Sequence, residues 1–420
     1  MKVLWKTNVM LPIVADRLNL KRTEVAGWLI GLSEEILKND SIELGICFPV
    51  QGEAYLFGSV GKLRYFGFPH KKTDPSKYDQ SIETYLFNII IDFQPDIVHI
   101  FGSEFPHTLA MTKVFGKPDR TIINIQGLAS IIAQHYTLGL SPIVRKSSTF
   151  RDFIRHDGII QQVHKMFLRG RYEVAAIKNV DHVVGRTDWD EACTKKINPA
   201  IQYHICPETL RTPFYENSWN ILNVERHSIF FSQAYYPVKG LHLVLNAFAD
   251  LLRNYPDASL YVAGEDIFTD HSLKGRLRKS FYAHYIEKRM KKLKIMNRVV
   301  FLGILDEKQM CAQYLKSHVF LSASTIENES NSLSEAKLLG VPSVASFVGG
   351  VTNRIIQGID GFLFPLNEPY MIAHYISKIF EDDGLATRVS ISARTNALKL
   401  FDKEKNLETM MEIYQKVLKS

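Results

Sequence analysis

Short apolar runs alternate along the chain with longer segments in which apolar residues recur every three or four positions. The short runs are typical of the buried strands of a parallel sheet, and the longer segments are typical of the helices that cover such a sheet. The predicted strands of the first half are Lys2 to Trp5, Ile42 to Phe48, a hairpin at Glu53 to Phe68, Ile97 to Phe101, Thr121 to Ile125 and Asp181 to Val184. Those of the second half are Ile229 to Ser232, Ser259 to Val262, Val299 to Leu302, Val319 to Leu321 and Ser343 to Phe347. The pattern predicts an α/β protein.

The stretch from Phe320 to Gly350 carries the densest set of local signals. A strand ends in small polar residues, and a helix follows in which Ser332 stands three positions before Glu335, as in a capping box. The helix is predicted to end at Gly340, and a second strand follows it. A polar loop therefore lies at the carboxyl end of a strand, which is where open parallel sheets bind ligands.

Two acids of this stretch, Glu327 and Glu335, flank the predicted start of the helix. The amides around Asn331 to Ser334 are expected to be unpaired, and such a helix start favours a diphosphate. The acids would then accept hydrogen bonds from hydroxyls, and a nucleotide-sugar has hydroxyls on both sides of its diphosphate. The spacing alone leaves a second interpretation open, in which Glu335 only caps the helix and Glu327 is a solvated loop acid.

The order of these elements resembles the signature of the retaining family-4 glycosyltransferases, also called glycosyl transferases group 1. The matching residues are Glu327, Glu335-Ala336, Gly340-Val341-Pro342, Gly349-Gly350, Gly358 and Gly361-Phe362-Leu363. The resemblance implies the GT-B architecture, in which two Rossmann-like α/β domains face each other across a cleft. It also implies sugar transfer from a nucleotide-diphospho-sugar with retention of the anomeric configuration and without a metal.

The length of 420 residues independently favours two domains, since it exceeds what one ordinary core supports. The irregular stretch Asn198 to Glu225, which contains three prolines, is interpreted as the connection between them. We expect an acceptor-side domain at 1–218, a nucleotide-sugar-binding domain at 219–400, and a C-terminal helix at 401–420 that crosses back onto the first domain.

A second element of the resemblance follows the strand at Ile229, where Pro237, Lys239 and Gly240 match the family's phosphate-binding "R…P.KG" pattern. Lys239 would neutralise charge on the departing diphosphate. The family's arginine is absent, because Gln233 and Ala234 occupy its position. Either local amides or Arg186 could compensate for it.

The resemblance assigns further roles in the donor site. Glu327 is expected to hold the donor sugar and, with Lys239, to form the catalytic pair, whereas Glu335 would hold the ribose. The remaining donor-binding residues are predicted to be Asn331, Ser332, Leu333, Gly240 and Gly303, the last through the loop that meets the nucleotide base.

The first domain offers five candidate contacts to the acceptor, namely Gly27, Glu104, His107, Gln126 and Arg186. Ala26-Gly27 matches the family's glycine-rich turn only in part, and a packing role for Gly27 is equally open. His107 could equally be a structural histidine. Gln126 stands where many family members have a histidine, so it can hold a hydroxyl but cannot act as a base.

Charge adds one candidate surface. The net charge is +7, and the stretch Ser141 to Lys178 combines arginines and lysines with isoleucines and phenylalanines. It is either a solvated face or a surface for an anionic membrane. No nucleic-acid-binding motif is present. The acids Asp188 and Asp190 after Thr187 resemble a metal-binding Asp-x-Asp, but they fit a helix cap better.

The four cysteines show no metal-ligand spacing and are interpreted as reduced thiols. No stretch approaches the roughly 20 apolar residues of a spanning helix. We therefore expect a cytoplasmic protein, peripheral on the inner face of the membrane if the basic stretch binds lipid.

Together these observations predict a retaining glycosyltransferase that uses a UDP- or GDP-sugar as donor and needs no other cofactor. The acceptor would be a glycan or lipid-linked molecule, as in bacterial cell-surface polysaccharide synthesis. Two alternatives stay open. A sugar-nucleotide epimerase or hydrolase would turn over the donor without an acceptor, and a non-catalytic binding subunit would explain the missing arginine and Gln126.

Overall fold

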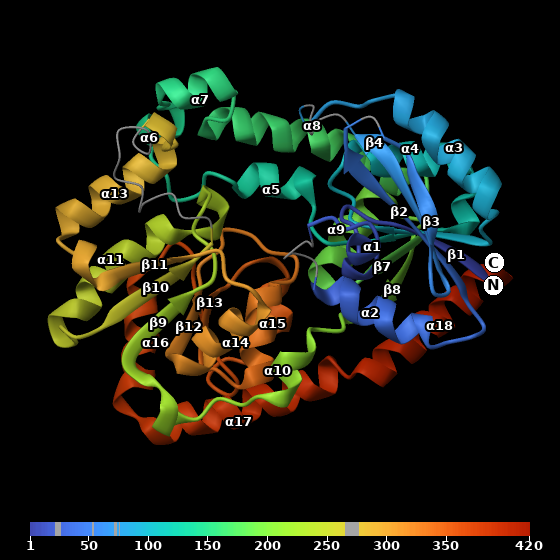
Figure 1. Ribbon diagram of the computed structural model, residues 1–420. Coiled ribbons are helices and arrows are strands. Elements are labelled where there is room, and N and C mark those ends of the chain that lie inside the picture. Colours follow the sequence, from blue (N-terminus) through green and yellow to red (C-terminus); the bar gives the residue numbers. More distant parts are fainter. Residues whose placement is uncertain (22–26, 53, 71–73, 75, 265–276) are drawn as a thin grey trace. The chain divides into compact units, whose positions relative to one another are not determined.

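A computed structural model describes residues 1–21, 27–52, 54–70, 74, 76–264 and 277–420 (Figure 1). Contacts between residues divide the chain into two compact units. Unit 1 comprises residues 1–133, 165–211 and 401–420, and unit 2 comprises residues 134–164 and 212–400. The chain leaves unit 1 within helix α5 (Ala129–His135) and returns to it within helix α8 (Ile159–Lys178).

Unit 1 is built on an eight-stranded sheet with the order β3-β4-β2-β1-β5-β6-β7-β8. All neighbours are parallel except β3 and β4, which form the antiparallel hairpin expected from the sequence; Glu53 lies outside the described residues. The strands are β1 (Lys2–Lys6), β2 (Glu43–Gln51), β3 (Leu56–Val60), β4 (Leu63–His70), β5 (Ile97–Phe101), β6 (Thr121–Asn124), β7 (His182–Gly185) and β8 (Gln202–Ile205).

Strand β8 corrects the sequence analysis, which placed these residues in an irregular connection. Its four residues, Gln-Tyr-His-Ile, contain no apolar run, because β8 is an edge strand with two exposed positions. It pairs with β7 in parallel over its whole length. Hydropathy alone cannot identify a strand of this kind.

The helices of unit 1 include the last helix of the chain, α18 (Lys403–Lys419), as the resemblance implied. Its side chains Met410, Ile413, Tyr414 and Val417 are buried in the same core as Trp5 of β1. The Trp5 indole donates a hydrogen bond of 2.9 Å to the Tyr414 hydroxyl. The other helices are α1 (Pro12–Arg17), α2 (Gly27–Leu37), α3 (Ser81–Phe93), α4 (Pro106–Phe115) and α9 (Asp188–Ile197).

Unit 2 is built on a six-stranded parallel sheet with the order β11-β10-β9-β12-β13-β14. The strands are β9 (Glu225–Phe231), β10 (Ser259–Ala263), β11 (Val299–Gly303), β12 (Ser317–Ser322), β13 (Ser343–Ser346) and β14 (Phe362–Phe364). The helices are α6 (Pro142–Lys146), α7 (Phe150–Arg155), α10 (Thr212–Glu216), α11 (Leu241–Asn254), α13 (Phe281–Leu293), α14 (Glu307–Lys316), α15 (Asn331–Leu339), α16 (Tyr370–Glu381) and α17 (Asp383–Leu400).

Helix α11 shows how unit 2 builds its core. Leu241, Val244, Leu245 and Phe248 recur at helical spacing and are almost completely buried. Burying side chains of this size contributes about 1.5–3 kcal/mol each. The helix begins at Leu241 and not at Lys239, because residues Pro237–Lys239 form a separate 3-10 turn and Gly240 adopts the left-handed conformation between them.

The described residues contain neither a helix that is long and apolar enough to cross a membrane nor a cluster of three possible metal ligands. All four cysteines are free thiols.

Candidate active site

Two loops at the carboxyl edge of the unit 2 sheet lie against each other, one after β9 and one after β12. The Thr325 amide of the second loop donates a 2.8 Å hydrogen bond to the Val238 carbonyl of the first. Gly240 has a φ of 78°, and a Cβ atom there would lie 1.8 Å from the Ala323 carbonyl oxygen. Only glycine allows this approach, which explains why a glycine follows Lys239.

The contact between these loops brings together the two residues predicted to be catalytic. The Lys239 ammonium donates to Glu327 Oε1, and the Ser324 hydroxyl donates to the same oxygen at 2.8 Å. Burial alone would lower the pKa of Lys239, but the neighbouring Glu327 carboxylate outweighs it and raises that pKa above its ordinary value. The lysine is therefore cationic at neutral pH, as a diphosphate partner must be.

The backbone of Glu327 is fixed by the glycine pair that follows β13. The Gly350 amide donates a 3.0 Å hydrogen bond to the Glu327 carbonyl oxygen. A Cβ atom on Gly349 would lie 2.0 Å from that oxygen, and Gly349 has a φ of 47°. The Gly-Gly sequence thus permits the turn that holds the Glu327 loop in place.

The start of helix α15 differs from the predicted capping box. The N-cap residue is Ser330 and not Ser332, since the Ser330 hydroxyl accepts a 3.4 Å hydrogen bond from the Leu333 amide. The Ser334 amide donates to the Ser330 carbonyl, so two of the amides expected to be free are paired. Among the described residues, the amides of Asn331 and Ser332 have no partner and stay available to an anion.

The donor-binding side chains predicted on α15 are mostly buried. Leu333 and Glu335 face inward, and Asn331 carries a buried Oδ1 atom that has no hydrogen-bond partner among the described residues. The Ser332 carbonyl accepts a 2.8 Å hydrogen bond from the Tyr314 hydroxyl, which fixes the first turn. Gly303 ends β11 with a φ of 73° and faces open space where a side chain would stand.

An ionic network beneath α15 was not recognised from the sequence. Arg354 pairs with Glu329 in the loop, and Lys337 of α15 pairs with Asp360 at 2.7 Å. Asn396 donates a further 2.9 Å hydrogen bond to Asp360. All four charged side chains are at least nine-tenths buried, so the network fixes the loop and helix that carry the predicted donor residues.

In unit 1, two of the predicted acceptor contacts carry buried polar atoms without a partner among the described residues. They are Oε2 of Glu104 and Nδ1 of His107. Burial raises the pKa of Glu104 and lowers the pKa of His107 well below its ordinary value. The His107 ring stacks on Phe105, with centroids 5.3 Å apart.

Lys6 belongs to the same cluster and was not singled out in the sequence analysis. Its side chain is completely buried at the end of β1, and Nζ donates to Asn8 Oδ1 at 3.0 Å and to Thr108 Oγ1 at 3.1 Å. Burial lowers the pKa of Lys6 to about 7, although the Cys47 thiol and Glu104 act against it. The predicted strand ended at Trp5, whereas β1 includes Lys6 as its last residue. A lysine at the end of a buried strand must be either exposed or buried with partners, and this was the available signal.

The other three acceptor-side candidates are placed as follows. Gln126 donates a 2.8 Å hydrogen bond to Asn124, and Gly27 is the first described residue of α2, with Ala26 outside the described residues. The Arg186 side chain is buried, pairs with Glu208 and donates to the Ile125 carbonyl at 3.0 Å. Their contact with an acceptor or a phosphate stays a prediction, and Arg186 would have to exchange Glu208 for it.

The helix-cap interpretation of the Asp-x-Asp sequence is confirmed. Thr187 and Asp190 form a capping box at the start of α9, each side chain bonding the backbone of the other. The Tyr203 hydroxyl also donates to Asp190, which is buried. Asp190 is therefore committed to structure.

Residues 217–396 match the family model described as "Glycosyl transferases group 1". Protein YtcC of Bacillus subtilis strain 168, which is named as a glycosyltransferase, is 24% identical over 196 residues, 46% of each chain. D-inositol 3-phosphate glycosyltransferase of Corynebacterium diphtheriae is 27% identical over 161 residues, 38% of this chain and 35% of the relative. The chain thus spans about half, or less, of the length of these curated relatives.

Solved structures resemble the whole chain. Sucrose-phosphate synthase of Thermosynechococcus elongatus aligns with a TM-score of 0.71 over 99% of each chain at 15% identity. Anabaena Alr3699/HepE, solved in complex with UDP and glucose, aligns with a TM-score of 0.66 over 99% of each chain at 14% identity. Residues 217–396 are thus similar to a glycosyl transferases group 1 domain, and the chain has the GT-B fold.

Proposed function

We propose that the protein is a retaining, metal-independent glycosyltransferase that uses a nucleotide-diphospho-sugar as donor. The observation that carries this proposal is the contact between Lys239 and Glu327 at the carboxyl edge of the unit 2 sheet, inside the group 1 domain. A cation and a carboxylate at one edge can hold the diphosphate and a sugar hydroxyl of the same donor. The acceptor is proposed to be a hydroxyl of a glycan or a lipid-linked molecule, as in bacterial cell-surface polysaccharide synthesis.

The proposed roles of the donor residues rest on the family resemblance and are supported by their surroundings. Lys239 and the amides of Asn331 and Ser332 would hold the diphosphate, because Lys239 is a cation at this edge and the two amides have no partner among the described residues. Glu327 would accept a hydrogen bond from the donor sugar. Glu335 would accept one from the ribose, and Gly303 would approach the base through its backbone.

The ion pair of the free protein has a consequence for binding. A bound diphosphate would draw the Lys239 ammonium toward its own oxygens and free Glu327 Oε1 to accept from a sugar hydroxyl. The two residues would therefore exchange one partner each when the donor binds, and the Ser324 hydroxyl keeps Glu327 oriented during that exchange.

The proposed reaction breaks the bond between the sugar's anomeric carbon and the diphosphate oxygen and forms a bond from that carbon to the acceptor oxygen. The acceptor proton passes to the departing diphosphate, which leaves as a nucleoside diphosphate. Attack occurs on the face that the leaving group departs from, so the configuration is retained. Catalysis consists mainly of positioning and of stabilising the negative charge on the leaving group.

The first test is calorimetric titration of the wild type with UDP, GDP and ADP. UDP is the first candidate, since the fold relative HepE was solved with UDP-glucose. We expect one diphosphate to bind preferentially and to bind more weakly to Glu335→Ala. The matched control is Glu412→Ala. It removes an exposed glutamate of α18, which belongs to unit 1 and not to the unit that carries Glu335.

Two outcomes would overturn the proposal in different ways. Binding of none of the three diphosphates would favour a non-catalytic protein, consistent with Gln233 and Ala234 in place of the arginine. Turnover of the UDP- or GDP-sugar at the same rate with and without acceptor would favour an epimerase or hydrolase.

A further inference from the structure

Helix α7 presents its apolar face to solvent. Phe150, Phe153 and Ile154 are 76%, 66% and 59% exposed, and their spacing of three and four positions places them on one face of the helix. The side chain between them, Asp152, is 1% exposed. This is the opposite of α11, whose apolar side chains at the same spacing are buried.

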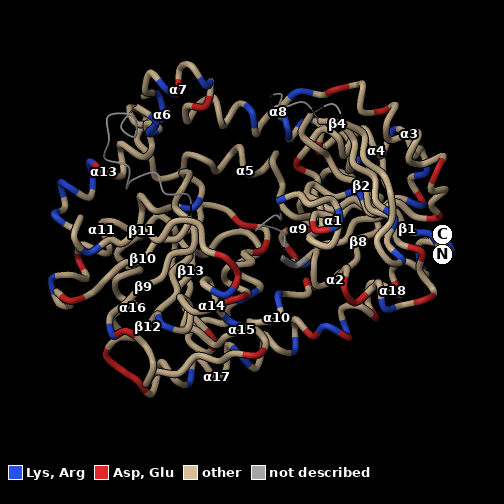
Figure 2. The backbone as a smooth tube through the Cα atoms, in the orientation of Figure 1, with Lys and Arg blue, Asp and Glu red and all other residues tan. Residues whose placement is uncertain are grey.

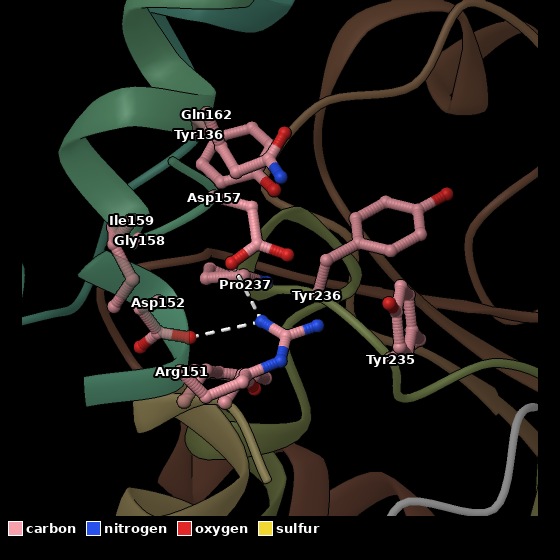
Figure 3. Close-up of a pocket in the computed structure, with 12 residues that line it drawn as sticks. Tyr136, Arg151, Asp152, Asp157, Gly158, Ile159, Gln162, Tyr235, Tyr236 and Pro237 are labelled. Carbon is pink, nitrogen blue, oxygen red and sulfur yellow. Dashed lines mark hydrogen bonds and ion pairs between the residues drawn. The ribbon is translucent and has the colours of Figure 1, made fainter. Parts of the chain in front are cut away.

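Polar contacts fix this inverted orientation. Thr149 and Asp152 form a capping box at the start of α7, and Asp152 also accepts a 2.8 Å hydrogen bond from the Phe281 amide. Arg151 donates to Asp152 at 2.9 Å and to Asp157 at 2.6 Å (Figure 3). These residues line a small pocket with Tyr235 and Tyr236, so the charged face of α7 is anchored in unit 2.

The segments on either side of α7 also carry exposed apolar and basic side chains. Ile143 of α6 is 79% exposed, and Ile160 at the start of α8 is also exposed. Lys146 and Arg155 are exposed beside them, and Lys and Arg residues mark α6 and α7 in Figure 2. The acids of residues 141–160 are Asp152 and Asp157, and both bind Arg151. Within residues 141–160, the outward surface therefore combines bulky apolar side chains with positive charge that neither acid of this segment pairs.

We propose that α6 and α7 dock unit 2 on the surface of an anionic lipid bilayer. Short helices with aromatic and aliphatic side chains on one face and lysine or arginine beside them bind at the interface of such membranes, with the rings among the acyl chains and the cations near headgroup phosphates. The negative surface of the bilayer complements Lys146 and Arg155.

A second copy of the chain fits this surface less well. A two-fold interface would place Lys146 and Arg155 of one copy close to the same residues of the other, where like charges repel. The inference goes beyond the proposed sugar transfer and does not depend on it, because lipid binding is measured without donor or acceptor.

The test is co-sedimentation of the full chain with two kinds of vesicle. One is phosphatidylcholine alone, and the other contains about 30% of the anionic lipid phosphatidylglycerol to represent an anionic surface. We expect binding to the anionic vesicles, weakened by high salt, and a loss of about tenfold or more in Phe150→Ser/Phe153→Ser. The matched control is Phe57→Ser, which removes a 69% exposed phenylalanine from β3 in unit 1. This control should bind like the wild type.

A second variant, Lys146→Gln/Arg155→Gln, changes only exposed polar side chains and keeps the proposal testable if the first variant does not fold. It should lose most of the preference for anionic vesicles. Wild-type protein that stays in the supernatant with both vesicle types would overturn the proposal. Equal losses of vesicle binding in Phe57→Ser and in Phe150→Ser/Phe153→Ser would also overturn it. The same holds if the wild type is a dimer in size-exclusion chromatography and Phe150→Ser/Phe153→Ser is a monomer.

Discussion

The polar side chains at the carboxyl edges of the two sheets differ in how many of them have a partner. In unit 2 two ion pairs stand out among the described residues of this edge: Lys239 with Glu327, and Glu329 with Arg354. In unit 1 Arg186 pairs with Glu208, but Lys6 and His107 are buried without an ion-pair partner among the described residues, and the half-buried Glu104 and His107 each keep a buried polar atom without a hydrogen-bond partner there.

The difference shows in the pKa values. The neighbouring carboxylate raises the pKa of Lys239 despite its burial, whereas burial dominates at Lys6 and lowers its pKa to about 7. A paired charged group is organised before its ligand arrives, whereas a buried polar atom without a partner gains when a ligand supplies the missing hydrogen bond. This contrast supports the proposal that unit 2 binds the nucleotide-sugar and that unit 1 meets the acceptor.

Removing the carboxylate of the unit 2 pair should have the largest effect. We expect Glu327→Ala to lower kcat by on the order of 10³ while UDP or GDP affinity changes only a few-fold, because Lys239 stays available to the diphosphate. Steady-state kinetics and calorimetry measure the two effects separately. Equal losses of affinity and turnover would contradict the assigned division of roles.

Removing the cation should affect both measurements. Lys239→Met is expected to lower kcat by about 10² and to weaken binding of the nucleoside diphosphate by about tenfold, since the charge contacts both donor and leaving group. The matched control is Lys337→Met, whose loss should appear first as reduced thermal stability because Lys337 pairs with buried Asp360. If the diphosphate affinity of Lys239→Met were unchanged, the proposed contact between Lys239 and the diphosphate would be wrong.

Replacing the buried Lys6 of unit 1 by an apolar residue should stabilise the protein by an amount that depends on pH. The pKa of Lys6 is about 7 in the folded state and near its ordinary value of 10.5 when unfolded. Between these values the unfolded state binds more protons, so wild-type stability rises with pH; below pH 7 the full cost of burying the charge is present. Lys6→Met should therefore be more stable by on the order of 4 kcal/mol below pH 7.

That advantage of Lys6→Met should shrink as the pH rises toward 10.5, and urea unfolding at several pH values measures it. Two curves that run parallel over this range would show that Lys6 does not titrate there. The comparison between the edges would then lose its electrostatic basis.

The glycine that supports Glu327 allows a smaller and sharper test. Gly349→Ala combines left-handed backbone strain with a clash against the Glu327 carbonyl, and should cost about 2–3 kcal/mol in urea unfolding and weaken diphosphate binding. Gly358→Ala has a φ of 75° but open space around its Cβ position, so strain alone should cost about 1–2 kcal/mol. Similar losses in both variants would mean that the clash is relieved without moving Glu327.

The sequence predicted most of the fold because buried parallel strands are continuous apolar runs, as in Val319 to Leu321. It did not predict β8, whose edge position leaves it polar, and it shifted the cap of α15 by two residues because Ser330 and Ser332 are both suitable caps. The pair proposed to be catalytic, Lys239 and Glu327, was predicted through a family pattern, and the structure places the two side chains in contact. The Arg354–Glu329 and Lys337–Asp360 ion pairs and the buried contacts of Lys6 join residues that are distant in sequence. No local sequence pattern contains such contacts.

The division of the chain also sets the order in which the protein can fold during synthesis. Unit 1 needs residues 401–420, since Tyr414 of α18 bonds both Trp5 and His99 in its core. Every residue of unit 2 lies between 134 and 400, so it can complete its contacts while the ribosome still holds α18. The unit whose strands are made first is therefore the last to close, and until then its apolar surface is exposed to chaperones and proteases.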